Sequence, residues 1–107
     1  MKLAEVPTRL SQIGIPVVYD HWEAVPGEVH DPPFICWRDS ARDNFFADGK
    51  VWQSAHRIII ELYTAMKDPA LEALVEAALD DVAWVSGEAT YIEAEHCYMQ
   101  YFEFEVI

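Results

Sequence analysis

Hydrophobic and polar positions in this chain follow two different spacings. Between Asp68 and Asp81 the apolar residues recur at helical intervals, and acidic residues line the opposite side. Asp68 suits the N-cap of a helix, and Pro69 suits its first position. The pattern therefore predicts an amphipathic helix over residues 68–81. Asp80 and Asp81 oppose the helix dipole at its C-terminal end, a cost that is explained only if a partner supplies positive charge.

The longest predicted strand covers Val51 to Thr64, and its apolar residues gather in the second half. At ~3.3 Å per residue it would span about 45 Å, whereas a domain of this size has a radius of gyration of only about 13 Å. One end must therefore project or bend, and Val51 to His56 is the less apolar end. Asp39 to Lys50 reads as a long loop that ends in the turn-forming pair Asp48-Gly49. Together these segments predict a projecting hairpin arm.

The rest of the chain adds shorter elements. His96 to Ile107 alternates between apolar and acidic residues, as a strand with one buried face does. The other expected elements are a helix over residues 2–12 and strands over 15–23, 34–38, 82–86 and 90–93, the last two around a Ser86-Gly87 turn. The order predicts one α+β domain over residues 1–107, with a mostly antiparallel sheet, two helices on one face and a projecting β-hairpin arm.

Composition narrows the class of protein. The chain is 52% hydrophobic and 13% aromatic, which is too apolar for a disordered protein. Nineteen acidic residues against seven Lys and Arg give a net charge of −12. Such a surface repels phosphate, so we expect neither specific DNA binding nor an anionic membrane as partner.

The N-terminal region bears on the expected location of the protein, and that location bears on the redox state of its two cysteines. Residues 1–15 contain no continuous apolar core of the kind that a secretion signal needs, and no run approaches the length of a membrane span. We therefore expect a cytosolic protein in which Cys36 and Cys97 are free thiols.

Candidate reactive groups are sparse. Asp20 and His21 are neighbours on an expected strand, so their side chains should point to opposite faces. The same argument separates His96 from Cys97, and His56 shares a face with apolar residues. No nucleophile, base and orienting group fall into a known motif, so we expect no catalytic activity, no cofactor and no metal site.

The segment from Asp43 to Gly49 is unusual because it places Phe45 and Phe46 side by side among polar residues. One interpretation is that a phenylalanine folds back onto the core. The alternative is an apolar contact for another subunit, since exposed apolar groups in polar surroundings mark contact sites. On that interpretation Asn44, Phe45, Phe46 and Trp52 are the candidate subunit contacts.

Four segments together resemble a known family. They are residues 14–37, 43–52, 60–79 and 89–106, and "IELYTAMKDPALEALVEAAL" at 60–79 is the most distinctive. The chain is similar to small tail-completion, or tail-terminator, proteins of long-tailed phages and prophages of Gram-positive bacteria. Such proteins often have a smaller residue at the position of Phe46 and a tyrosine at Trp52, so these two are weak choices for a contact shared by the family.

The resemblance implies a virion structural protein at the head–tail junction. It implies a homo-oligomeric ring, commonly of six copies, that ends the tail tube and contacts the major tail protein and head-completion proteins. The protein would lie in the host cytoplasm during assembly and in the virion tail afterwards. A negative channel would let DNA pass without specific binding.

Three other functions stay open from the residues alone. They are a different head–tail joining or tail-assembly factor, a small acidic module that binds a protein partner, and a minor hydrolase. The oligomeric state separates the ring former from the binding module, because a ring former should be multimeric at assembly concentrations.

Overall fold

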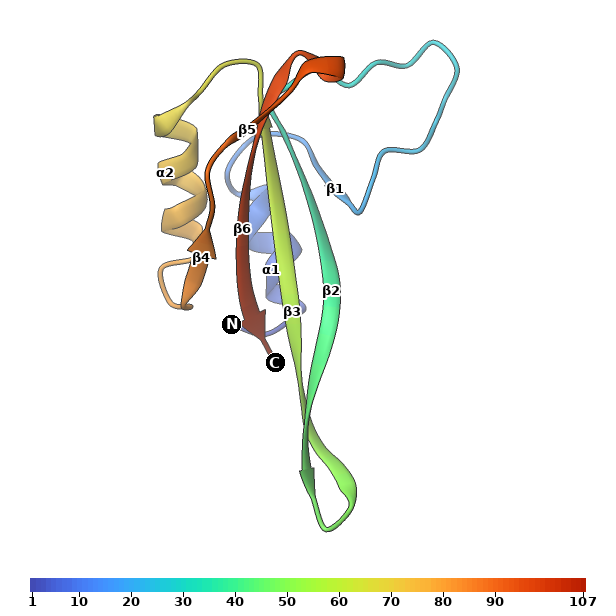
Figure 1. Cartoon of the computed structure of the whole chain (residues 1–107), viewed down its shortest axis with the longest axis vertical. Coiled ribbons are helices and arrows are strands. Elements are labelled where there is room, and N and C mark those ends of the chain that lie inside the picture. The colour runs from blue at the N-terminus through green and yellow to red at the C-terminus, as the bar shows by residue number, and fades with distance from the viewer.

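The computed structural model describes the backbone of residues 1–107, and all side chains except those of Phe45, Ala47 and Trp52. Across this range the chain forms a mostly antiparallel six-stranded sheet with two helices on one face, so the expected α+β class is confirmed. The strand order is β1-β2-β3-β6-β4, and β5 pairs with β6 beside β4. Figure 1 shows the long β2–β3 hairpin running past the end of the other elements.

The first half of the chain supplies α1 (Glu5–Ser11), β1 (Val17–Tyr19), β2 (Phe34–Ala47) and β3 (Lys50–Thr64). Helix α1 begins later than expected, which places Pro7 in its first turn, where a missing N–H costs nothing. Strand β1 is shorter than the expected 15–23, because Asp20 adopts a left-handed conformation with φ of 67°. It pairs parallel to β2, while β2 and β3 are antiparallel.

The second half supplies α2 (Pro69–Ala78), β4 (Trp84–Ser86), β5 (Thr90–Ile92), a short 3-10 turn (Glu93–Glu95) and β6 (Cys97–Val106). The predicted helix is confirmed with its cap, since the Asp68 carboxylate accepts the Leu71 N–H at 3.1 Å. The expected turn at Ser86-Gly87 between the two short strands is wrong, because the chain does not reverse direction between them. Strands β4 and β5 both pair with β6 and not with each other.

The expected loop over 39–50 is wrong, because β2 continues to Ala47 and pairs with β3 throughout. The turn at Asp48-Gly49 is confirmed, with φ of 53° and 75° at its two residues, as a tight two-residue hairpin turn requires. The sequence did not predict this strand, because a two-stranded ribbon exposed on both faces lacks the alternation of apolar and polar residues that indicates a strand.

The core lies between the helices and one face of the sheet. Even-numbered residues of β3 and β6 point toward the helices, and α1 and α2 meet them with their apolar stripes. The buried set is Val6, Leu10, Ile35, Ile58, Ile60, Leu62, Leu71, Val75, Leu79, Phe102, Phe104 and Val106. All of it lies in the body, so the far half of the β2–β3 hairpin extends beyond the core. The dimensions of 52 × 32 × 24 Å and the radius of gyration of 15.4 Å reflect this extension.

Candidate functional site: the arm and the notch at its root

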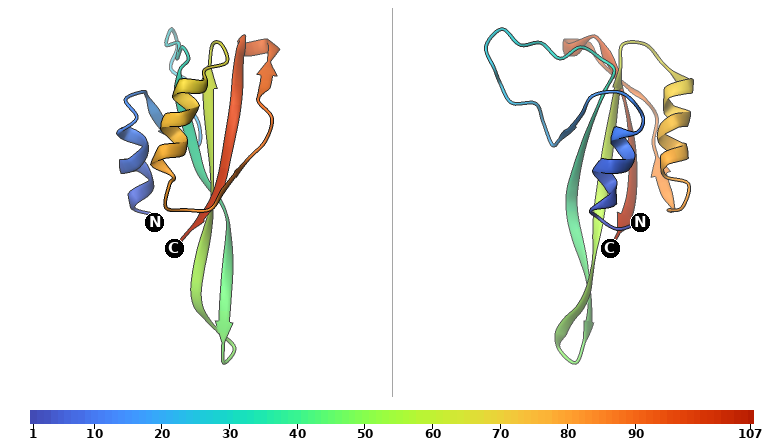
Figure 2. Two further views of the ribbon diagram at one scale, coloured as in Figure 1. Left: turned by 90° about the vertical axis from the view of Figure 1, so that its left-hand side faces the viewer. Right: turned by 180° about the vertical axis from the view of Figure 1, so that it is seen from behind.

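The projecting part of the β2–β3 hairpin, residues 38–57, is called the arm below. It begins where β1 stops pairing at Trp37 and rejoins the sheet where His56 and Arg57 pair with the end of β6. Beyond that root the arm is a two-stranded ribbon, as Figures 1 and 2 show from three sides. The expectation of a projecting arm is therefore confirmed.

Polar cross-strand pairs hold the arm together in place of a core. At the root, the Asp39 carboxylate lies 2.6 Å from His56 Nδ1, and both side chains are largely buried. Further out, the Ser54 hydroxyl donates to the Asn44 side-chain oxygen at 2.6 Å. Register shifts at Asp39/Ala41 and Phe45/Phe46 mark bulges, which increase the local twist of a ribbon. The arm is a paired ribbon with its own local interactions.

The tip of the arm presents apolar surface to solvent. Phe46 is 69% exposed and Val51, its direct partner across the ribbon, is 54% exposed. Of the candidate contact residues, Phe46 is thus free to meet another molecule, whereas Asn44 is engaged by Ser54 inside the arm. The side chains of Phe45 and Trp52 lie outside the described part of the structure, so their roles stay predictions.

The arm and the rest of the chain, called the body, differ in net charge. Residues 38–57 contain four of the seven Lys and Arg residues but only three of the nineteen Asp and Glu residues. The remainder of the chain therefore has three basic and sixteen acidic residues. The arm is slightly positive on a strongly negative body, a contrast that the sequence contains but that has meaning only once the arm is seen to project.

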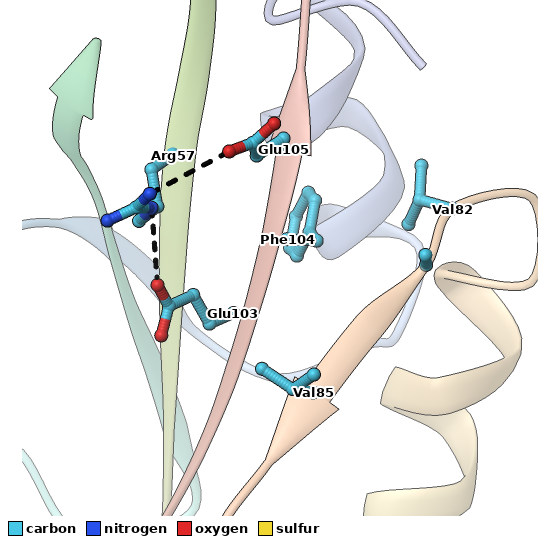
Figure 3. A pocket seen from close by; sticks show the side chains of 7 residues that line it. Arg57, Val82, Val85, Glu103, Phe104 and Glu105 are labelled. Atoms are coloured by element: carbon cyan, nitrogen blue, oxygen red, sulfur yellow. Dashed lines mark ion pairs between the residues drawn. The ribbon is translucent and has the colours of Figure 1, made fainter. Parts of the chain in front are cut away.

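A hollow of about 470 Å³, called the notch below, lies at the root of the arm on the β4 side. It forms because β4 stops pairing at Trp84, opposite Phe104, whereas β6 continues to Val106. Figure 3 shows Val82, Val85 and Phe104 on one side and Glu103, Glu105 and Arg57 on the other. Val85 is 61% exposed, so the notch has an accessible apolar wall beside an acidic rim.

Three carboxylates share one guanidinium at the rim of the notch. Arg57 lies 3.3 Å from Asp43, 3.4 Å from Glu103 and 3.8 Å from Glu105. The pKa of Glu105 is raised, first through its hydrogen bond to Asp43, then by loss of solvation and by repulsion from Asp43. The rim therefore keeps an excess of negative charge that a single arginine does not neutralise.

A second hollow, of about 620 Å³, lies at the opposite end of the body, beneath the loop that follows β1. Trp22 stacks on His30 there, with ring centroids 3.9 Å apart, and both cysteines line it. Burial, and then the Glu61 carboxylate, raise the pKa of Cys36 to about 11; burial also raises the pKa of Cys97. Both free thiols are therefore protonated at neutral pH and are poor nucleophiles.

Three of the four histidines, His21, His30 and His56, lie beside a carboxylate. His21 Nδ1 lies 2.8 Å from the Asp20 carboxylate, which corrects the expectation that the two point apart, because the left-handed Asp20 ends the strand before them. His96 also has a left-handed conformation and precedes β6, so strand alternation does not separate it from Cys97. Among the side chains that the structure describes, no group of three or more His, Cys, Asp or Glu is placed to hold a metal ion. No helix in the described chain has the length and apolarity to cross a membrane.

The positive charge missing from the end of α2 comes from within the chain. Arg9 of α1 makes two contacts with the Asp81 carboxylate, at 2.5 and 2.8 Å, and donates to the Ala78 carbonyl at 3.3 Å. The bond lowers the pKa of Asp81. Expecting a partner to supply this charge was therefore wrong, and sequence reasoning missed Arg9 because 72 residues separate the pair.

A comparison with models of known protein families finds no match, and a search of curated proteins finds no relative. The arm, the notch and the charge contrast between arm and body therefore form the basis for a functional assignment.

Proposed function

We propose that the chain is a structural subunit of a long-tailed bacteriophage that assembles into a ring at the head–tail junction and completes the tail tube. The observation that carries this proposal is the projecting arm, which holds Phe46 and Val51 exposed at its tip, beyond the core. Exposed apolar side chains that lie next to each other are typical of contact sites. The resemblance of residues 60–79 and the neighbouring segments to tail-completion proteins supplies the class of assembly.

The acidic body fits the same role. Sixteen acidic residues outside the arm would give an assembled ring a negative surface. Phosphate is repelled by such a surface, so DNA would pass a ring of this kind without being retained. The same charge opposes association of one body with another, which leaves the arm as the part best suited to join copies.

Phage assembly provides a direct test of this proposal. Deleting the gene from a phage that encodes the chain should give tails of uncontrolled length that fail to join filled heads, because an uncapped tube continues to polymerise. Purified chain added to tail tubes should appear at one tube end by negative-stain microscopy. Tails of normal length joined to heads in the deletion strain would overturn the proposal.

A second candidate is a small acidic module that binds a protein partner, and the hollow at Trp22 favours it. Within the described side chains, the indole nitrogen of Trp22 is buried without a hydrogen-bond partner, and Asp20, Glu28, Asp31 and Glu95 line the same hollow. A basic side chain of a partner would suit the acidic residues and the ring of Trp22, and a carbonyl group beside it would suit the indole nitrogen. Trp22→Phe tests this candidate. It would favour the binding module over the ring former if it abolished head–tail joining while variants of the arm joined heads to tails normally.

A further inference from the structure

The arm tip and the notch are complementary surfaces at different places on one molecule. We propose that the arm tip of one copy docks in the notch of the next copy; the inference rests on the proposed role as an assembly subunit and names the contact that builds the assembly. Two different surfaces meeting in this way form a head-to-tail contact, and its repetition gives a ring when the rotation between copies closes.

Apolar complementarity is the first support. The tip offers Phe46 and Val51, both more than half exposed, as one pair across the ribbon. The notch offers Val85, 61% exposed, next to Val82 and Phe104. Its volume of about 470 Å³ falls within the range of ~300–1,000 Å³ that is usual for clefts that accept a ligand group. An aromatic side chain is the kind of anchor that such a hollow accepts at an interface.

Charge complementarity is the second support. Lys50 lies next to the tip pair, is exposed and follows directly on the turn, whose first residue, Asp48, is an exposed carboxylate. The rim of the notch carries an excess of negative charge, because Arg57 is the one ion-pair partner that the described side chains offer to Glu103, Glu105 and Asp43. Lys50 from the next copy would add the second positive charge at this rim. Like-charged bodies gain no comparable contact from each other.

The geometry excludes the molecule's own tip as the occupant of its notch. The notch lies at the root of the arm, beside Arg57, whereas Lys50 lies seven residues before Arg57, at the start of β3. At ~3.3 Å per residue the tip is about 23 Å from its own notch, and a paired ribbon cannot fold back over that distance. The tip therefore reaches the notch of a neighbouring molecule and not its own.

Two single variants disable the two surfaces separately. Phe46→Ser removes the apolar anchor from the tip, and Val85→Lys fills the notch with a side chain that can pair with Glu103 or Glu105. Each should weaken self-association at least tenfold in sedimentation velocity, relative to the wild-type chain at the same concentration. Leu74→Ser is the matched control, because Leu74 is 51% exposed on α2 and lies outside both surfaces. Thermal unfolding of each variant checks that the fold is intact.

Mixing the two variants tests the head-to-tail character of the contact. The Val85→Lys copy retains a working tip and the Phe46→Ser copy retains a working notch, so one contact forms between them. The resulting dimer has a disabled tip at one end and a disabled notch at the other. Neither variant alone should associate, and the mixture should stop at the dimer. Growth of the mixture beyond a dimer, or no dimer at all, overturns the inference.

The remaining outcomes separate this inference from the proposed function. A wild-type chain that stays monomeric at about 1 mM, where millimolar associations are half populated, overturns the tip–notch contact. A Phe46→Ser variant that self-associates as the wild type does also overturns the contact. A Phe46→Ser variant that still caps tail tubes overturns the contact as well, but the proposed function then stands. Tail tubes that bind no copy of the wild-type chain overturn the proposed function instead, whatever the association measurements give.

Discussion

The two halves of the β2–β3 hairpin have the same backbone pairing but different surroundings. In the body, Ile58 and Ile60 are fully buried under the helices, and β1 and β6 flank the pair. In the arm, Phe46 and Val51 are mostly exposed, and the strands rely on the turn and on polar pairs such as Asn44 with Ser54. Strand formation and burial are therefore separate properties in this fold. The body half stabilises the domain, and the arm half is available for contact.

Substitution in the two halves should give very different losses of stability. Ile60→Ala should lower the free energy of unfolding by ~2–5 kcal/mol, because a buried side chain is lost and a cavity remains. Val51→Ala, on the same strand but in the arm, should change it by less than about 0.5 kcal/mol. Urea denaturation of dilute protein measures both values. Equal losses would mean that the arm packs like the body and would remove the contrast.

Loosening a helix should weaken the body and leave the arm unchanged. Asp68→Ala removes the acceptor for the Leu71 N–H and should cost about 1 kcal/mol of stability. Asp80→Ala is the control at the other end of α2, where removing a negative charge should be neutral or slightly stabilising. Amide hydrogen exchange should show unchanged local opening in residues 42–55. Faster exchange there through local opening would indicate that α2 supports the arm as well.

A substitution at the tip should weaken the arm and leave the body largely unchanged. Gly49 has φ of 75°, a conformation that costs alanine about 1 kcal/mol, so Gly49→Ala should loosen the arm. Amide protection in the arm should fall about fivefold, while global unfolding changes by less, because the body keeps its core. Asp48→Asn is the control, since asparagine tolerates the same turn conformation. Loss of global stability by the full local amount would show that body and arm fold as one unit.

The smallest effect concerns the charge cluster where arm and body meet. The pKa of Glu105 is raised in the folded state, so the folded chain binds this proton more tightly than the unfolded chain does. The carboxylate therefore opposes folding at neutral pH, and this opposition disappears as pH falls toward the ordinary glutamate value of about 4.3. Glu105→Gln should raise the melting temperature at pH 7 and not at pH 4. A rise of the same size at both pH values would exclude this cause.

Local signals in the sequence were sufficient for the elements with a strong pattern of their own. Asp68 and Pro69 marked the start of α2, the alternation around Phe102 and Phe104 marked β6, and Asp48-Gly49 marked the hairpin turn. The excess length of β3 also predicted that something must project. These features depend on residues close together in the chain, so a single sequence contains them.

What the sequence could not provide depends on distant partners. The far part of β2 is polar and reads as a loop, and only its pairing with β3 makes it a strand. The notch exists because the pairing of β4 with β6 ends at Trp84 and Phe104 while β6 continues. Arg9 meets Asp81 only after both helices pack. Of the proposed contacts, Phe46 is predicted from its unusual neighbours in the sequence, whereas Val85 and Lys50 have no local signal that distinguishes them.

The two ends of this chain lie side by side, and the Leu3 N–H donates to the Ile107 carbonyl at 3.0 Å. A short linker could therefore join them, and the chain could be opened instead in the exposed loop at Ala24 to Pro26. Such a circular permutant should keep the same sheet, because no strand crosses the new opening. It would also move affinity tags and fluorophores away from the root of the hairpin, where a fusion at residue 1 or residue 107 would be placed.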